Sequence, residues 1–149
     1  MTQREVSTTV TDSPEETFAL GQKVGAGLLG GEILLLHGGL GAGKTLFAKG
    51  VLGGLGYDVD EVTSPSFTLV NLYKTGKFDV YHIDFWRLDK GGDLAGAVGI
   101  SDMLEDESAV LVIEWPERLK GFDFGRRLLE VTIEGDGEGP RKISLGRSD

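Results

Sequence analysis

The chain has 149 residues and no cysteine, and its 24 acidic and 15 basic side chains give a net charge of −9. The length fits one domain, the lack of cysteine excludes disulfides and thiol catalysis, and the negative charge argues against direct binding of nucleic acid or anionic membrane. No apolar run approaches the ~18 residues of a membrane span, and the N-terminus lacks the basic-then-apolar pattern of a signal peptide. We therefore expect a cytoplasmic protein without membrane contact.

The N-terminal third predicts two strands, each followed by a helix. Ser13 and Glu16 have the spacing of a capping box, with Pro14 at the first helical position. The apolar run at 33–36 is typical of a strand buried on both faces of a parallel sheet. The expected elements are a strand over 5–11, a helix from the Ser13 cap to the glycines at 30–31, a strand over 33–36 and a helix over 44–55.

The rest of the chain predicts further strands and a closing hairpin. The run at 109–113 is again fully apolar, whereas 128–133 and 142–145 flank a glycine-rich loop. We therefore expect one α/β domain over 1–149, with a mostly parallel sheet flanked by helices and a C-terminal β-hairpin. The expected elements are strands over 67–70, 78–84 and 109–113, short helical pieces within 85–108, and the hairpin of 128–133 with 142–145.

Residues 38–45 read Gly-Gly-Leu-Gly-Ala-Gly-Lys-Thr and fit the pattern G-x-x-x-x-G-K-[ST] between an expected strand and an expected helix. Glycines let successive backbone N–H groups turn toward a phosphate, and the helix N-terminus adds a positive field there. Lys44 would reach the β- and γ-phosphates of a nucleotide, and the Thr45 hydroxyl would bind Mg²⁺. This context predicts a P-loop NTPase.

Two expected strands end in a carboxylate, Asp84 and Glu114. Ligands of open parallel sheets bind at the carboxyl ends of the strands, where a phosphate loop needs acids to hold Mg²⁺ and position water. Each acid can instead be an ordinary solvated strand end. For His82 the packing role is favoured over a base, and Trp115 is either a wall of the nucleotide site or a core aromatic.

The class of nucleotide follows by elimination. Asn71 is the only asparagine and Leu72 follows it, so the Asn-Lys-x-Asp motif with which Ras-type GTPases recognise guanine is absent. ATP is therefore the expected nucleotide. A small-molecule kinase remains the alternative, but such enzymes usually cover the transferred phosphoryl group with arginines on a lid. The only arginine pair here, Arg126 and Arg127, comes late in the chain. We therefore favour an ATPase subunit that switches a partner.

Four blocks, in order and spacing, resemble the TsaE (YjeE) family; they are residues 40–45, 64–70, 81–88 and 113–116. The resemblance runs from about residue 13 to residue 143. It implies a cytoplasmic bacterial ATPase required for threonylcarbamoyladenosine (t6A) formation in tRNA. It further implies partners, TsaD and TsaB, which ATP hydrolysis would reset between turnovers. TsaD would carry out the transfer itself, and tRNA would be met only through the complex.

The resemblance also assigns the cofactors ATP and Mg²⁺ to single residues. It implies a catalytic set of Lys44, Asp84 and Glu114, a Mg²⁺ site of Thr45 and Glu114, and a nucleotide site of Leu40, Gly41, Ala42, Gly43, Lys44, Thr45 and Trp115.

The resemblance extends to the surroundings of the site. It implies that the nucleotide approaches residues 12–14 and 137–141, and that residues 63–68 act as a switch near the γ-phosphate. Ser66 stands where the family commonly has Thr, and Trp86 where it has Tyr. Because the switch segment offers only hydroxyl groups and no strong base, hydrolysis by the isolated chain is expected to be slow and to rise when partners bind.

Overall fold

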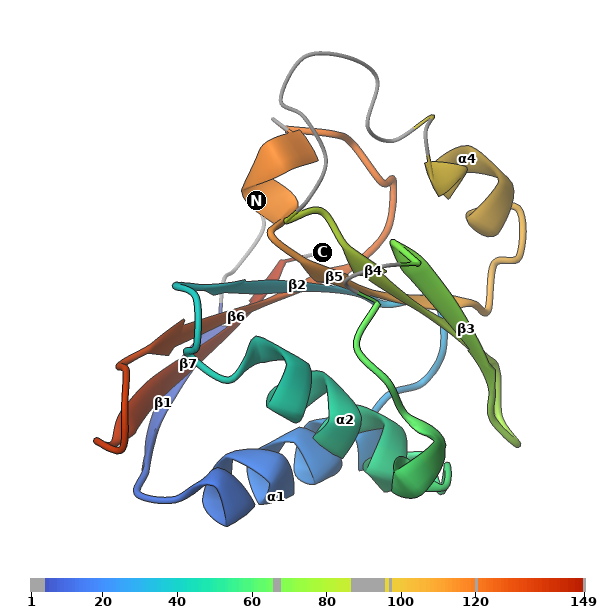
Figure 1. Ribbon diagram of the computed structural model, residues 1–149. Helices are drawn as coiled ribbons and strands as arrows, with labels where there is room; N and C mark the ends of the chain where they lie inside the picture. The colour runs from blue at the N-terminus through green and yellow to red at the C-terminus, as the bar shows by residue number, and fades with distance from the viewer. Residues whose placement is uncertain (1–4, 66–67, 87–95, 97, 120, 149) are drawn as a thin grey trace.

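The computed structural model describes residues 5–65, 68–86, 96, 98–119 and 121–148. Its seven strands form one sheet in the order β1-β7-β6-β2-β5-β4-β3 (Figure 1). The elements are β1 (Glu5–Thr11), α1 (Pro14–Ala26), β2 (Ile33–Gly38), α2 (Lys44–Gly54), η1 (Val59–Glu61), β3 (Val70–Lys74), β4 (Asp79–Asp84), α4 (Ile100–Met103), β5 (Val110–Glu114), η2 (Pro116–Leu119), β6 (Leu128–Glu134) and β7 (Arg141–Ser148).

The sheet is mixed. The four central strands β6, β2, β5 and β4 are parallel, as expected. The outer pairs β1–β7, β7–β6 and β3–β4 are antiparallel, so the prediction of a mostly parallel sheet is wrong outside the centre. The reason is local: β3–β4 and β6–β7 are hairpins with short connections, which only antiparallel strands can have. The C-terminal hairpin itself is present as predicted.

Helices cover both faces of the sheet. Helices α1 and α2 lie together on one face, and α4 and η2 lie on the other (Figure 1). The alternating side chains of β2 divide the core accordingly: Leu34 and Leu36 pack with Phe47 of α2, whereas Ile33 and Leu35 pack with Ile100 of α4. This arrangement confirms the α/β class and directs alternate residues of the central strands toward α2.

The start of α1 follows the expected capping box. The Ser13 Oγ accepts a hydrogen bond from the Glu16 amide at 3.1 Å, and the Glu16 carboxylate accepts one from the Asp12 amide at 2.8 Å. The helix ends at Ala26, before the predicted glycine pair, because the chain turns at Gly27. The cap fixes the entry of the chain into α1, beside the loop that follows β2.

The third strand begins later than the sequence predicts. Leu69 has a φ of 69° and its amide donates to the Pro65 carbonyl at 2.8 Å, so this segment turns before the strand starts at Val70.

Within the described residues, no helix is both long and apolar enough to cross a membrane.

Candidate functional site

The glycine-rich loop 38–45 connects the end of β2 to the start of α2, at the carboxyl edge of the parallel strands. Gly41 and Gly43 have φ values of 79° and 110°, in the left-handed region that side chains with a Cβ rarely adopt. Gly43 is the N-cap of α2 and makes no side-chain cap. The first amides of α2 therefore keep donors for another partner, and the helix dipole makes this point attractive to anions.

Lys44 lies back over this loop. Its side chain is only 5% exposed, and its Nζ donates hydrogen bonds to the carbonyls of Gly38 at 2.7 Å and Gly39 at 2.9 Å. The same ammonium lies 4.0 Å from the centre of the Trp115 ring, a cation–π contact. Burial lowers the pKa of Lys44, and the carboxylates of Glu114, Glu117 and Asp84 partly offset that shift.

Thr45, Glu114 and His82 form a chain of hydrogen bonds. The Thr45 hydroxyl lies 3.0 Å from each carboxylate oxygen of Glu114. Glu114 Oε2 lies 2.6 Å from Nε2 of His82, a fully buried residue of β4. His82 Nδ1 has no partner among the described residues. The buried carboxylate of Glu114 is therefore held from two elements, the N-terminus of α2 and strand β4.

Asp84 ends β4 directly beside Glu114, its neighbour in the parallel ladder. The residue is 6% exposed, and its Oδ1 accepts a hydrogen bond from the Trp86 amide at 2.8 Å. Burial raises the pKa of Asp84, the charge of Glu114 raises it further, and the Trp86 amide, His82 and Lys44 oppose the shift. A carboxylate whose pKa moves toward neutrality is suited to accepting a proton.

Two tryptophans close one side of the loop. The Trp86 and Trp115 rings lie 4.5 Å apart, and the Arg118 guanidinium lies 5.4 Å from the centre of the Trp86 ring. Trp115 has a φ of 60°, which costs a residue with a Cβ about 1–3 kcal/mol. Backbone strain of this kind is common where a side chain must be aimed at a functional site.

These groups line one cavity of about 280 Å³. Every predicted site residue except Ala42 lies on its wall, and Trp86 and Leu46 complete it. The predicted residues that the fold brings together here are Leu40, Gly41, Gly43, Lys44, Thr45, Asp84, Glu114 and Trp115. Ala42 faces an adjoining cavity instead.

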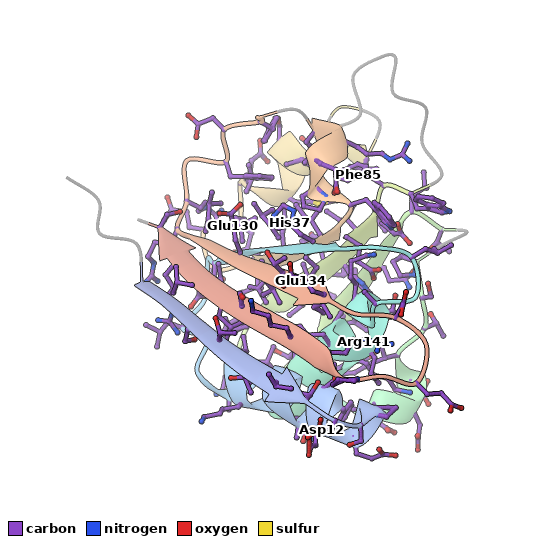
Figure 2. The ribbon with its side chains drawn as sticks, turned by 90° about the vertical axis from the view of Figure 1, so that its left-hand side faces the viewer. Asp12, His37, Phe85, Glu130, Glu134 and Arg141 are labelled. Carbon is purple, nitrogen blue, oxygen red and sulfur yellow. The ribbon has the colours of Figure 1, made fainter. Side chains whose placement is uncertain are left out.

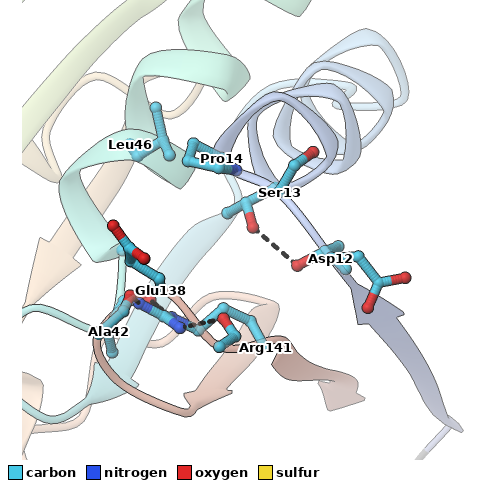
Figure 3. A pocket seen from close by; sticks show the side chains of 12 residues that line it. Asp12, Ser13, Pro14, Ala42, Leu46, Glu138 and Arg141 are labelled. Atoms are coloured by element: carbon cyan, nitrogen blue, oxygen red, sulfur yellow. Dashed lines mark hydrogen bonds between the residues drawn. The ribbon is translucent and has the colours of Figure 1, made fainter.

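The adjoining cavity has a volume of about 370 Å³ and shares Gly43 and Leu46 with the first. Its walls come from the end of β1, the start of α1 and the β6–β7 hairpin loop (Figure 3). Asp12 and Ser13 lie on one side, and Glu138 and Arg141 on another. The fold thus places residues 12–14 and 137–141 beside the glycine loop, where the resemblance led us to expect them.

Sequence reasoning missed two members of this region. It treated His82 as a packing residue, whereas the ring contacts Glu114; the two-residue spacing from Asp84, which directs both side chains to one face of β4, was the available signal. It did not single out Arg141, whose guanidinium contacts the glycine loop, because no local pattern links residues about 100 positions apart.

The predicted switch segment 63–68 contributes nothing to the wall of the first cavity within its described residues. The Thr68 hydroxyl donates to Asn71 at 2.7 Å, and Asn71 Nδ2 donates to the Thr63 hydroxyl at 3.3 Å. Ser66 lies outside the described residues. Within the described residues, the site included, no group of three or more His, Asp or Glu side chains is placed to hold a metal ion.

Comparison with known proteins identifies the family. The family model described as threonylcarbamoyl adenosine biosynthesis protein TsaE matches residues 11–143. The chain is 34% identical to the tRNA threonylcarbamoyladenosine biosynthesis protein TsaE of Bacillus subtilis over 91% of its own length and 82% of that protein's. Identity to the Aquifex aeolicus protein of the same name is 35%, over 93% of this chain and 94% of that one.

A solved structure agrees with these sequences. The crystal structure of YdiB from Bacillus subtilis superposes with a TM-score of 0.73 and 29% sequence identity, covering 100% of this chain and 88% of that one. The family model alone spans most of the chain, and its matched region contains the whole candidate site. The chain therefore belongs to the TsaE family.

Proposed function

We propose that this protein is an ATP-binding and ATP-hydrolysing subunit required for t6A modification of tRNA. In this proposal it acts in the cytoplasm with the TsaD–TsaB complex and resets that complex between turnovers. The observation that carries the ATPase activity is the convergence of Lys44, Thr45, Asp84 and Glu114 on one cavity at the N-terminus of α2. The role in t6A rests on the names of the relatives.

The loop 38–45 supports binding of a nucleotide triphosphate. Its left-handed glycines and the free first turn of α2 are suited to surrounding a phosphate with N–H donors. The Lys44 ammonium is already inside the loop, bonded to two carbonyls that a phosphate oxygen could replace as partners. The nucleoside would extend toward the adjoining cavity between α1 and the β6–β7 hairpin loop.

The donor set of Thr45 and Glu114 fits Mg²⁺. Both offer hard oxygen ligands, and the hydroxyl and carboxylate are already within 3.0 Å of each other. Two protein ligands are few for a metal site, but Mg²⁺ commonly takes its remaining ligands from substrate phosphates and water. The ion would neutralise charge on the phosphates, while His82 keeps the Glu114 carboxylate in place.

Asp84 is the side chain best placed to orient and deprotonate the attacking water. Glu114 is engaged by Thr45 and His82, whereas Asp84 makes one described hydrogen bond, to the Trp86 amide. Its pKa is raised by burial, which brings a carboxylate closer to the range in which general bases work. Lys44 would hold the γ-phosphate while that water attacks.

The direct test compares the parent chain with Lys44→Ala. The substitution removes the charge on the phosphates, and we expect kcat for ATP hydrolysis to fall about 100- to 1,000-fold, the size typical of one preorganised donor. Lys49→Ala is the matched control: Lys49 is a half-buried lysine of α2 that lines neither cavity, so this variant should hydrolyse ATP at the parent rate. Equal turnover by the Lys44 variant and the parent would refute the ATPase assignment.

The same assay separates the ATPase from a small-molecule kinase. ADP release is followed with a panel of metabolites, and products are examined by mass spectrometry. A phosphorylated product formed in proportion to ADP would favour the kinase. The role in t6A is tested by omitting the chain from a reconstituted reaction with TsaD, TsaB and tRNA, where repeated turnover should stop.

A further inference from the structure

The guanidinium of Arg141 connects two loops by bonding only to backbone carbonyls. The residue opens β7, and its five N–H donors all have backbone carbonyls as partners. Two of those carbonyls belong to the glycine loop and three to the β6–β7 hairpin loop. Figure 3 shows Arg141 beside Ala42 and Glu138. The contacts are Nε to Ala42 at 2.9 Å, Nη2 to Gly41 at 3.3 Å and Gly137 at 2.9 Å, and Nη1 to Asp136 at 3.1 Å and Gly139 at 2.6 Å.

These bonds fix part of the glycine loop. In a trans peptide the C=O and N–H groups point in opposite directions, so a carbonyl held by Arg141 turns the next amide away from the guanidinium. The bond to the Ala42 carbonyl therefore sets the direction of the Gly43 amide. Gly43 is the N-cap of α2 and lines both cavities, so its amide lies where they meet.

The charge of Arg141 adds to this effect. Carbonyls are neutral partners, and none of the salt bridges in the described part of the chain involves Arg141. A guanidinium remains charged at any physiological pH. The glycine loop therefore has a second fixed cation: Lys44 bonds to the carbonyls of Gly38 and Gly39, and Arg141 bonds to those of Gly41 and Ala42.

We propose that Arg141 is a positioning residue that couples the β6–β7 hairpin loop to the glycine loop. The inference rests on the proposed function, in which the hairpin loop borders the nucleoside and the glycine loop holds the phosphates. Arg141 keeps the two walls of the site in register, so that the amides of the glycine loop are ordered before the nucleotide arrives. Preorganisation of this kind raises affinity because less order has to be created on binding.

Arg141→Lys is the informative variant, because lysine retains the charge but cannot make the planar fork of five bonds. Arg126→Lys is a matched control. That guanidinium also bonds only to carbonyls, at the opposite edge of the sheet; its partners are Gly31 and Ala109 at 3.2 Å, Leu104 at 2.8 Å and Asp106 at 3.0 Å.

The first measurement is amide hydrogen exchange without nucleotide. In Arg141→Lys we expect exchange in the peptide covering residues 38–46 to rise about tenfold, the size expected for losing hydrogen bonds to a charged group. Peptides from β5 should be unchanged, which shows that the fold is intact. Unchanged exchange in residues 38–46, or an equal rise there in Arg126→Lys, would overturn the inference.

The second measurement is the Kd for ATP with Mg²⁺, followed by tryptophan fluorescence. Arg141→Lys should bind about tenfold more weakly than the parent, and Arg126→Lys within about twofold of it. Parent affinity in Arg141→Lys would overturn the inference while leaving the proposed function standing. Failure of the parent to bind ATP would instead refute the proposed function, and hydrogen exchange would still decide whether Arg141 couples the two loops.

Discussion

Glu114 is the most constrained side chain of the site. The Thr45 hydroxyl reaches both of its oxygens, and His82 Nε2 approaches one of them at 2.6 Å. A carboxylate that binds a metal depends on such neighbours, because they fix its orientation before the ion arrives. In the proposed function His82 would therefore affect Mg²⁺ only through Glu114, as a positioning residue.

This role predicts different effects for two substitutions of His82. Glutamine can still donate a hydrogen bond to Glu114, whereas phenylalanine fills the space of the ring without a donor. We expect His82→Phe to weaken the Mg²⁺ dependence of ATP binding by about 10- to 100-fold and His82→Gln to retain most of it. Titrating ATP with and without Mg²⁺ measures the difference. Equal losses in both variants would assign His82 to packing alone.

The buried carboxylate of Asp84 is expected to favour hydrolysis of ATP and to destabilise the folded protein. Burial raises its pKa above the usual 3.8, so the folded protein binds this proton more tightly than the unfolded chain does. Ionising the buried carboxylate therefore lowers the free energy of unfolding. This destabilisation is absent at pH below 3.8 and is present in full once the pH exceeds the raised pKa. Asp84→Asn retains the acceptor for the Trp86 amide but removes the charge. The variant should therefore be more stable at pH 7 and hydrolyse ATP more slowly.

Thermal unfolding at pH 7 and near pH 4 measures this effect. Each pKa unit corresponds to about 1.4 kcal/mol, and for a chain of this size 1 kcal/mol shifts Tm by about 2–4 °C. The gain should shrink as the pH falls. Glu134→Gln, at an exposed strand end, controls for the loss of one negative charge from an acidic chain. A lower Tm for Asp84→Asn than for the parent at pH 7 would contradict the prediction.

At the scale of elements, the contact between α1 and α2 sets how near the glycine loop lies to the adjoining cavity. Glycines of each helix meet the backbone of the other. A Cβ at Gly21 would lie 2.4 Å from the Phe47 carbonyl oxygen, and one at Gly50 would lie 2.3 Å from that of Phe18. Because α2 starts at the glycine loop and α1 starts at the adjoining cavity, the close approach of the helices brings the two together.

Gly50→Ala should therefore destabilise the protein. Alanine favours a helix by about 1 kcal/mol over glycine, but the added methyl group would push two backbones apart, which typically costs about 1–3 kcal/mol or more. Gly27→Ala is the control, since its Cβ would lie 3.6 Å from the nearest atom at the end of α1. Urea unfolding should show a lower midpoint for Gly50→Ala alone; an unchanged midpoint would mean that the helices separate without cost.

The elements that the sequence predicted well are those that local chemistry determines. The capping box placed the start of α1 correctly, and the apolar runs of β2 and β5 identified two central strands. The start of β3 was missed because Leu69 adopts a positive φ, which glycine signals and leucine does not. The antiparallel pairing of β1 with β7 depends on which strands meet in space, because these two strands come from opposite ends of the chain.

In the candidate site, too, local sequence patterns could be predicted and contacts between distant residues could not. Lys44 and Thr45 could be predicted because the phosphate-loop pattern is local, and Asp84 and Glu114 because both end strands. The contacts of His82 and Arg141 could not, since each depends on residues that are distant in sequence. The close approach of Gly21 and Gly50 to the facing backbones likewise becomes visible only in the packed helices.

At the scale of the whole molecule, the charge of −9 fits a subunit that works beside tRNA without binding it alone. Acidic side chains also lie along β6: Glu130 is 3.4 Å from His37 of β2, and Glu134 is nearby (Figure 2). The affinity for RNA would have to come from the partners. We therefore expect the function of this chain to be expressed through the complex.

The rate of hydrolysis by the isolated chain depends on how well its own side chains position the attacking water. Glu114 is held by Thr45 and His82, and the hydroxyls of Thr63 and Thr68 are bonded to Asn71. Of the two strand-end carboxylates, Asp84 is therefore the one left to position water. A single carboxylate orients water poorly unless a second group fixes the geometry, and a partner that contacts residues 63–68 could supply that order.

We therefore expect slow hydrolysis by the lone subunit and a rise of about 100-fold or more with the TsaD–TsaB pair, the scale of one correctly positioned acid–base group. Steady-state ADP release with and without the pair measures this, and Asp84→Ala should abolish the stimulated rate because the partners would have no carboxylate to orient. Full-speed hydrolysis by the isolated chain, unchanged when the pair is added, would show that water is already positioned without partners and that residues 63–68 do not act as a switch.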